Sequence, residues 1–216
     1  MAFFEKPACA AIDSTGFEER HASKHYQTRI GKTRCRQSYW SKLAVCSDTS
    51  SHLILAARVA RGPGNDCILW KPLVKDASRY AHIDTGLGDA GFDSEENHAY
   101  ARLKIGVRLT VIKLNPRTHG RKWPQTKYRR QMKRRFLKRK YGQRSQIEST
   151  FSQHKRVLLS SLTARSKSTR KAEMHFRVLV HNLMILWLTA KDCNRAPLRE
   201  RADEPAVPAR GVRGDR

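Results

Sequence analysis

The chain has 216 residues, enough for one domain with a hydrophobic core, and its 44 lysines and arginines outnumber 19 acidic residues, giving a formal net charge of +25. This excess predicts a polyanionic partner, nucleic acid first and an anionic membrane second, although a ribosomal-type basic protein shows the same balance. The five cysteines include no Cys-x-x-Cys pair, which argues against a disulfide framework or a zinc site and favours a reducing cytosol. The start of the chain lacks the apolar core of a signal peptide, and the most apolar run, 178–190, is too short to span a bilayer.

The first part of the chain predicts strands. An apolar run that ends at Asp13 indicates a buried strand. The basic segment that follows has no periodic pattern, and its two histidines at i, i+4 spacing, His21 and His25, lack a third metal ligand. Two apolar runs, 42–46 and 52–59, flank a Ser-Asp-Thr-Ser-Ser turn and predict an antiparallel hairpin.

The middle of the chain predicts a helix and then a fourth strand. Gly-Pro-Gly at 62–64 breaks the chain, and Asn65 or Asp66 can cap a helix that runs to about Tyr80. The side chains expected on the inner face of this helix are Ile68, Leu69, Leu73 and Val74. The stretch HIDTGLGDAGFD, 82–93, predicts a short central strand followed by a tight glycine-rich turn.

A helix and a fifth strand are expected next. Asp93 and Glu96 match a capping box for a helix through Leu103. The β-branched residues of 107–114 predict a strand, which Pro116 ends. This order of elements predicts an α/β fold with a ribonuclease H-like mixed sheet flanked by helices, in which the first and fourth strands are neighbours.

The remainder of the chain predicts helices and a tail. A basic loop over 117–125 leads into a long helix over 126–159, with a possible break near Gly142. A last helix is expected over 169–189. The tail, 194–216, is rich in proline, arginine and alanine and poor in large apolar residues, so it is expected to be disordered.

The most informative stretch is YGQRSQIESTFSQHK. Tyr141, Arg144, Glu148 and Lys155 stand at offsets of 0, 3, 7 and 14, which fall within roughly 60° of arc on a helix. A neighbouring arc is apolar and consists of Phe136, Ile147, Phe151 and Leu158. The helix would therefore pack one face on a core and present one carboxylate among cations on the adjacent face. Solvated ion pairs on an exposed helix face are the alternative, but Glu148 is the one acidic residue between positions 96 and 173.

The spacing of these four residues resembles the Tyr-x2-Arg-x3-Glu-x6-Lys signature of bacterial insertion-sequence DDE transposases, families four and five. The text IDSTGFE around Asp13 and the text GDAGFDS around Asp89 also resemble that family, which typically has Asp-x-Gly-Tyr-Asp at the second site. The resemblance covers most of residues 10–190. It implies a ribonuclease H-like, retroviral-integrase-like fold, and metal-dependent cleavage of DNA at transposon ends followed by strand transfer into target DNA.

The resemblance implies that Asp13, Asp89 and Glu148 are the catalytic residues and bind two Mg²⁺ or Mn²⁺ ions. Carboxylates suit these ions because hard cations prefer oxygen ligands. Each residue has an alternative interpretation. Asp13 could cap a turn, and Asp84, inside the predicted strand, or Asp93, at the predicted helix cap, compete with Asp89 for the role of second ligand.

The resemblance also implies that Tyr141, Arg144 and Lys155 contact the DNA backbone near the cleavage site. Between 117 and 140 there are twelve lysines and arginines and no acid, which favours a phosphate track over a solvated helix or a nuclear-localisation-like patch. The track residues singled out for DNA binding are Lys133, Arg134 and Arg135. Trp123, in the same region, could stack on a base or anchor its loop to the core.

Together these features predict a DDE transposase catalytic domain over residues 1–193, followed by a disordered basic tail over 194–216. Its expected partners are double-stranded DNA and a second copy of the chain, in the bacterial cytosol and without a membrane. Because Asp13 lies so early, while relatives carry a helical DNA-binding region first, a truncated copy or one half of a split reading frame is expected. The alternatives are a basic DNA-binding remnant without chemistry and a ribonuclease H-like nuclease that cuts but does not join.

Overall fold

The computed structural model describes residues 7–19, 40–119 and 123–200. The strands are β1 (Ala8–Glu19), β2 (Trp40–Asp48), β3 (Ile54–Gly62), β4 (Ile83–Gly88), β5 (Leu109–Ile112) and β6 (Ser161–Leu162). The helices are η1 (Asp66–Leu69), α2 (Trp70–Ala77), η2 (Ala90–Phe92), α3 (Glu95–Ala99), η3 (Tyr100–Ile105), α4 (Pro116–His119), α5 (Lys127–Arg134), α6 (Lys138–Gly142), α7 (Ser145–Leu158) and α8 (Lys167–Glu200). The pair His21 and His25 lies outside the described residues.

The centre of the fold is a mixed sheet with strand order β3-β2-β1-β4-β5, and β6 pairs with the end of β1. The strands β1, β2 and β3 pair antiparallel with one another, whereas β4 runs parallel to β1 and β5 runs parallel to β4. The predicted hairpin and the predicted contact between the first and fourth strands are both confirmed. The end of the first strand at Asp13 is wrong, because β1 stays paired with β2 as far as Phe17 and continues to Glu19. This order is the ribonuclease H-like arrangement expected from the sequence.

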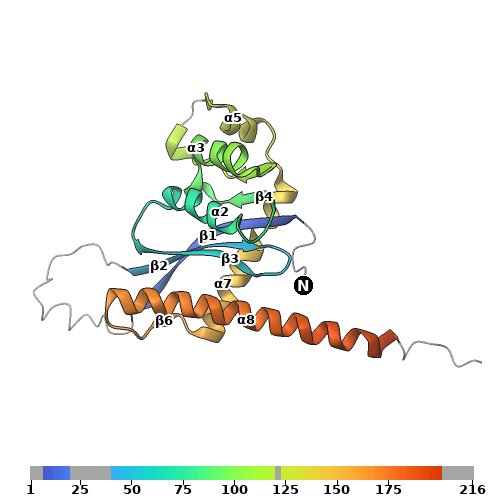
Figure 1. The fold of residues 1–216 in the computed structure, drawn as a ribbon. Coiled ribbons are helices and arrows are strands. Elements are labelled where there is room, and N and C mark those ends of the chain that lie inside the picture. The colour runs from blue at the N-terminus through green and yellow to red at the C-terminus, as the bar shows by residue number, and fades with distance from the viewer. Residues whose placement is uncertain (1–6, 20–39, 120–122, 201–216) are drawn as a thin grey trace, which may run out of the picture.

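Helices cover both faces of the sheet, because side chains of a strand alternate between its two faces. On β1, Ala10 and Ile12 enter one core with Trp70 of α2, whereas Ala11 enters the other core with Ile147 of α7. Figure 1 shows α2 and α3 on one side of the strands and the long helix α8 on the other. The first core is completed by Phe92 and Ala101, and the second by Met132, Phe151 and Met174.

The structure divides the long helix predicted over 126–159 into α5, α6 and α7, so the break near Gly142 is confirmed, whereas the break between α5 and α6 was not predicted. At the first break, Arg135 leaves helical geometry with φ −139° and ψ 76°, and Phe136 and Leu137 pack against the second core. Tertiary packing therefore overrides helix propensity at this point. At the second break, the backbone N–H groups of Gln143 and Arg144 bond to carbonyls three residues earlier, which tightens the turn between α6 and α7.

Two predicted roles near the other helices are also wrong. Ile68, expected inside, is 71% exposed, while its neighbours Leu73 and Val74 are buried as predicted. The N-cap of α3 is Ser94 and not Asp93. The carboxylate of Asp93 instead accepts a hydrogen bond from the backbone N–H of Asn115 at 2.8 Å, so it ties the η2 turn to the end of β5.

The last helix is longer than the sequence predicted. α8 runs from Lys167 to Glu200, through the first seven residues of the segment expected to be disordered. Residues 201–216 lie outside the described part of the chain. Within the described ranges, no helix combines the length and apolar character needed to cross a membrane.

A buried histidine lies where β1, α7 and α8 meet. His154 of α7 is 1% exposed, and its ring lies 5.7 Å from Phe17 of β1 and 5.8 Å from His181 of α8, centre to centre. Within the described residues, neither ring nitrogen of His154 has a hydrogen-bond partner. Burial, together with the nearby charges of His181, Arg177 and Lys155, lowers the pKa of His154 to about 4. The ring is therefore neutral in the folded protein at neutral pH.

This arrangement predicts that acid weakens the packing of α7 and α8. Because the folded-state pKa lies below the ordinary 6.5, His154 stabilises the fold above pH 6.5, and this stability is lost as the pH falls toward about 4. His154→Leu should remove the part of the pH dependence that comes from this side chain. Each unit by which the pKa of His154 differs between the folded and unfolded chains contributes about 1.4 kcal/mol to the free energy of unfolding. The check is the free energy of unfolding from urea titrations across this pH range. His82→Gln, at an exposed position, serves as the control. If the free energy of unfolding of His154→Leu fell as steeply on acidification as that of the wild type, the assignment to His154 would be contradicted.

Candidate active site

Asp13 on β1 and Asp89, the residue directly after β4, stand side by side. The parallel pairing of β1 with β4 ends with Ile12 opposite Gly88, so the next residue on each strand is Asp13 and Asp89. Asp89 caps the η2 turn, and its Oδ1 accepts a hydrogen bond from the backbone N–H of Gly91 at 2.9 Å. Strand pairing therefore brings together two carboxylates that are 76 positions apart in the sequence.

A third carboxylate, on the helix layer, is linked to Asp13 through an arginine. Arg144, at the N-cap of α7, donates from Nη1 to Oδ2 of Asp13 and from Nη2 to Oε1 of Glu148, both at 2.8 Å. The side chains of Arg144 and Asp13 are 18% and 19% exposed, whereas that of Glu148 is 62% exposed. One guanidinium thus links a strand in the middle of the sheet to the first turns of α7.

The electrostatics of this group are balanced against burial. Burial raises the pKa of Asp13, and the charge of Asp89 adds to that increase. The backbone N–H of Ser14 and the guanidinium of Arg144 act in the opposite direction and lower it. For Arg144, burial lowers the pKa, but the charges of Asp13, Tyr141 and Glu148 outweigh it and raise the pKa overall. Asp13 is therefore a carboxylate that burial destabilises and that needs a cation beside it.

The other two aspartates considered for the second position are occupied elsewhere. Asp84 lies near the start of β4, and both of its oxygens accept hydrogen bonds from Arg108, at 2.6 and 2.8 Å. These hydrogen bonds lower the pKa of Asp84. Asp93 has a fully buried side chain that pairs with Arg129 at 2.9 Å. Of the three, Asp89 is the one next to Asp13.

The donor set fits a hard divalent cation in its chemistry. Asp13, Asp89 and Glu148 offer carboxylate oxygens, which Mg²⁺ and Mn²⁺ prefer. In this structure Arg144 lies between Asp13 and Glu148 and occupies the space that a metal ion shared by these two carboxylates would need. Among the described residues, no three histidine, cysteine or acidic side chains are close enough to hold a metal ion as they stand.

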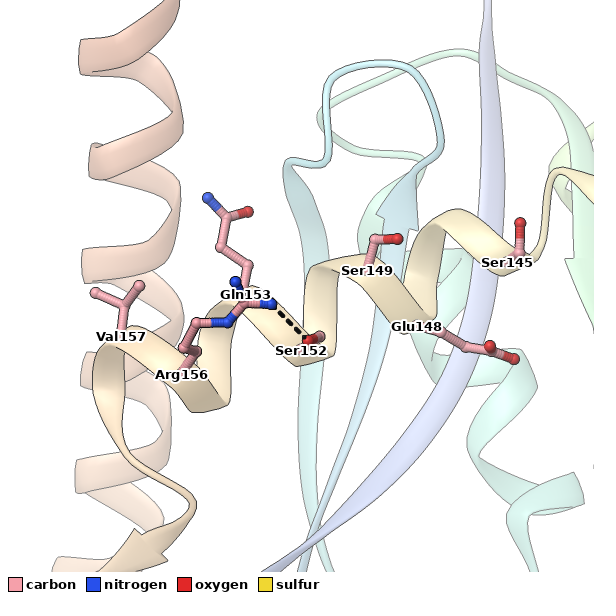
Figure 2. Close-up of a pocket in the computed structure, with 7 residues that line it drawn as sticks. All are labelled: Ser145, Glu148, Ser149, Ser152, Gln153, Arg156 and Val157. Atoms are coloured by element: carbon pink, nitrogen blue, oxygen red, sulfur yellow. Dashed lines mark hydrogen bonds between the residues drawn. The ribbon is translucent and has the colours of Figure 1, made fainter.

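Beside the carboxylates, the exposed face of α7 forms an open hollow of about 770 Å³. It is lined by Ser145, Glu148, Ser149, Ser152, Gln153, Arg156 and Val157. Figure 2 shows these side chains along one side of the helix, with Glu148 near one end and Arg156 hydrogen-bonded to Ser152 toward the other. Because every lining residue comes from one helix, the hollow is an open surface rather than a closed pocket, and of the three carboxylates it includes Glu148 alone.

The other residues of the four-point pattern have different surroundings. Tyr141 belongs to α6, where its ring packs 5.0 Å from that of Phe136 and 5.9 Å from the guanidinium carbon of Arg144. The ammonium of Lys155 lies 5.3 Å from the ring centre of Phe17 on β1. The single arc expected for the pattern is therefore interrupted between α6 and α7, because the turn there places Tyr141 on a separate helix.

The basic segment has a fixed position beside the site. Glu95 of α3 accepts hydrogen bonds from the backbone N–H groups of Tyr128 and Arg129, and so caps α5 from another helix. The pair Asp93–Arg129 adds a second tie, between the end of η2 and α5. The sequence analysis did not identify these anchors, since they join residues more than thirty positions apart.

The exposed side of this segment carries the predicted phosphate track. Lys133, Arg134 and Arg135 are all exposed at the end of α5. Trp123 is 47% exposed, and the ammonium of Lys133 lies 6.0 Å from its ring centre. The exposure of Trp123 favours stacking on a base over an anchor in the core.

Comparison with known families gives a match over most of the chain. The model of the transposase DDE domain matches residues 5–183. Comparison with curated proteins gives no significant match. The matched range contains the whole sheet, the three carboxylates and α7. The chain belongs to the transposase DDE domain family, whose members are enzymes of DNA phosphoryl transfer in transposition and recombination.

Proposed function

We propose that Asp13, Asp89 and Glu148 form the catalytic centre at which this transposase cleaves transposon ends and joins them to target DNA. The observation that supports this most is the strand register, which sets Asp13 beside Asp89 while Arg144 ties Asp13 to Glu148. The three carboxylates would hold two Mg²⁺ or Mn²⁺ ions. When bound, such ions neutralise phosphate charge and make a water or a 3′ hydroxyl a better nucleophile.

The surrounding cations would hold double-stranded DNA against this centre. Lys133, Arg134 and Arg135 offer sequence-independent contacts to phosphates, and Trp123 offers an exposed ring on which a base can stack. Tyr141 and Lys155 lie on either side of Glu148 in the sequence and would contact the backbone that flanks the cleaved bond. Arg144 has the planar fork that suits phosphate as well as carboxylate.

Replacing any one carboxylate tests the catalytic centre. Metal-dependent nicking and strand transfer should be abolished in each of Asp13→Ala, Asp89→Ala and Glu148→Ala, because each substitution removes a carboxylate ligand of the metal ions. Binding of duplex DNA, measured by fluorescence anisotropy, should change little. Asp84→Ala is the matched control, since Asp84 is held by Arg108 at the far end of β4, and it should keep full activity. Activity lost in Asp84→Ala and kept in Asp89→Ala would reverse the assignment of the second ligand.

The phosphate track is tested through the salt dependence of binding. Replacing Lys133, Arg134 and Arg135 together by glutamine should weaken binding to every DNA sequence alike. Each lost phosphate contact should flatten the slope of log affinity against log salt concentration by about 0.9. The triple replacement Lys71, Lys75 and Arg79 to glutamine, on and just after α2, is a control with the same change in charge. If the slope of the track variant equalled that of the wild type, DNA would have to bind another surface of the protein.

We also propose that the active form is a homodimer joined through α8. Its outward side chains Phe176, Leu183 and Trp187 are 69%, 55% and 71% exposed and follow a helical spacing. The stretch 178–190 contains no lysine, arginine, aspartate or glutamate, although 29% of the chain is charged. An uncharged stripe is unsuited to DNA, and two strongly basic copies can approach along it without facing like charges. A twofold interface uses the same patch on both partners, which such a stripe provides.

Charged substitutions in the stripe test the dimer. Phe176→Glu and Trp187→Glu should shift the chain toward monomer, because each would place a carboxylate in an apolar interface. Analytical ultracentrifugation of the free protein and of its DNA complex gives the measurement. Leu103→Glu, an equally exposed position on η3, is the control and should leave the mass unchanged. A monomer in the wild type, with and without DNA, would contradict this interface.

We further propose that the chain acts in the reducing cytosol of a bacterium. Cys9, Cys46 and Cys67 are free thiols, as expected where disulfides do not persist. Burial raises the pKa of Cys46 to about 12, so this thiol serves as a small apolar side chain of the core.

A further inference from the structure

Arg144 occupies the position of a cation at the proposed catalytic centre. Its two terminal nitrogens bond to two different carboxylates, Asp13 on the sheet and Glu148 on the helix, at the same distance of 2.8 Å. Its side chain is 18% exposed, so the guanidinium lies inside the group rather than above it. A divalent ion that used the same two carboxylates would have to displace it.

The two ion pairs of Arg144, with Asp13 and with Glu148, differ in how easily they could break. Asp13 is fixed on a central strand, and its Oδ1 also accepts a hydrogen bond from the backbone N–H of Ser14 at 2.8 Å. Glu148 is 62% exposed, and the contacts that hold its carboxylate include the i, i+4 pair with Arg144. The link to Glu148 can therefore open by side-chain rotation, without movement of the strand or of α7.

Phosphate is the competing partner with the matching chemistry. Guanidinium groups bind phosphate and carboxylate through the same pair of parallel N–H donors. Arg144 also lies between Tyr141 and the exposed polar face of α7, the surface that a DNA backbone would follow in the proposed function. A phosphate that took over Arg144 would leave Asp13 and Glu148 without their cation, at the same time as it brought more negative charge beside them.

We propose that Arg144 is a positioning residue that couples DNA binding to metal binding. Without DNA it bridges Asp13 and Glu148 and competes with divalent ions. With DNA it turns to a backbone phosphate and frees both carboxylates for the ions. By thermodynamic linkage, DNA then tightens metal binding and the metal tightens DNA binding by the same factor. This inference rests on the proposed function, because it requires that the carboxylates bind metal.

The first test measures metal binding to the DNA-free chain by isothermal titration calorimetry with Mn²⁺. Arg144→Gln removes the competing charge and should bind Mn²⁺ about tenfold more tightly, given the usual strength of a charged hydrogen bond. Arg79→Gln is the control, since Arg79 follows α2 on the opposite face of the sheet and is exposed to solvent, and it should match the wild type. Equal or weaker binding of Mn²⁺ in Arg144→Gln would overturn the inference.

A second variant covers the case in which Arg144→Gln does not fold. Arg144→Lys keeps the charge but replaces the fork with a single ammonium, which cannot bond both carboxylates in the same way. It should bind Mn²⁺ more tightly than the wild type, by a smaller factor than Arg144→Gln. Thermal unfolding with and without Mn²⁺ reports the same order through the change in Tm. A Lys variant identical to the wild type in both measurements would count against the competition.

The linkage itself is tested by the affinity for a short duplex in Ca²⁺ and in Na⁺ at equal ionic strength. The wild type and Arg79→Gln should bind the duplex more tightly in Ca²⁺, and Arg144→Gln should lose most of that gain. Asp13→Asn separates this inference from the proposed function. If Asp13→Asn binds Mn²⁺ as the wild type does, the metal site is wrong. If it weakens Mn²⁺ while Arg144→Gln changes neither measurement, the metal site stands and the coupling is wrong.

Discussion

The ion-pair group around Arg144 joins the two layers on which the site is built. Asp13 belongs to the central strand of the sheet, and Glu148 belongs to the helix that covers it. Packing of Ile147 and Phe151 on the sheet fixes the height of α7, but packing alone does not fix which polar residue faces β1. The guanidinium does so, because it bonds to one carboxylate from each layer.

The side chains of this group lower the stability of the folded chain in return for their proposed catalytic role. Burial raises the pKa of Asp13, so its ionised form is held at a cost that an apolar residue on β1 would avoid. Arg144 at the N-cap of α7 adds a further cost, since a cation near a helix N-terminus opposes the helix dipole. Both costs are offset while the carboxylates and the guanidinium face one another. The stability of the free chain and the chemistry proposed for its complex with DNA therefore depend on the same side chains.

Strand alternation and turn residues are local signals, so the sequence alone predicted the strands and the hairpin. The neighbouring positions of the first and fourth strands, and with them of Asp13 and Asp89, were expected from the ribonuclease H-like order of the elements. The sequence did not predict the break at Phe136, where burial against the sheet replaces helical hydrogen bonds. Nor did it predict that Asp93 would pair with Arg129 instead of capping α3, because no periodic pattern in the sequence marks an ion pair between distant residues. The geometry of Arg144 was missed for the same reason, because its spacing to Glu148 fits an ordinary i, i+4 pair on an exposed helix.

The charge of the whole chain has a physical reason in this arrangement. A centre made of three carboxylates repels the phosphates on which it is proposed to act, so the two can meet only where other charges outweigh the repulsion. The segment 117–140 supplies twelve cations and no acid, and Glu95 and Asp93 hold its helix α5 beside the η2 turn that carries Asp89. Between positions 97 and 191 the chain has two acidic residues, Glu148 and Glu173, and each of them pairs with an arginine four residues away. Glu148 can stand as an isolated acid on α7 because Arg144 accompanies it, and the surplus of positive charge elsewhere remains available to DNA.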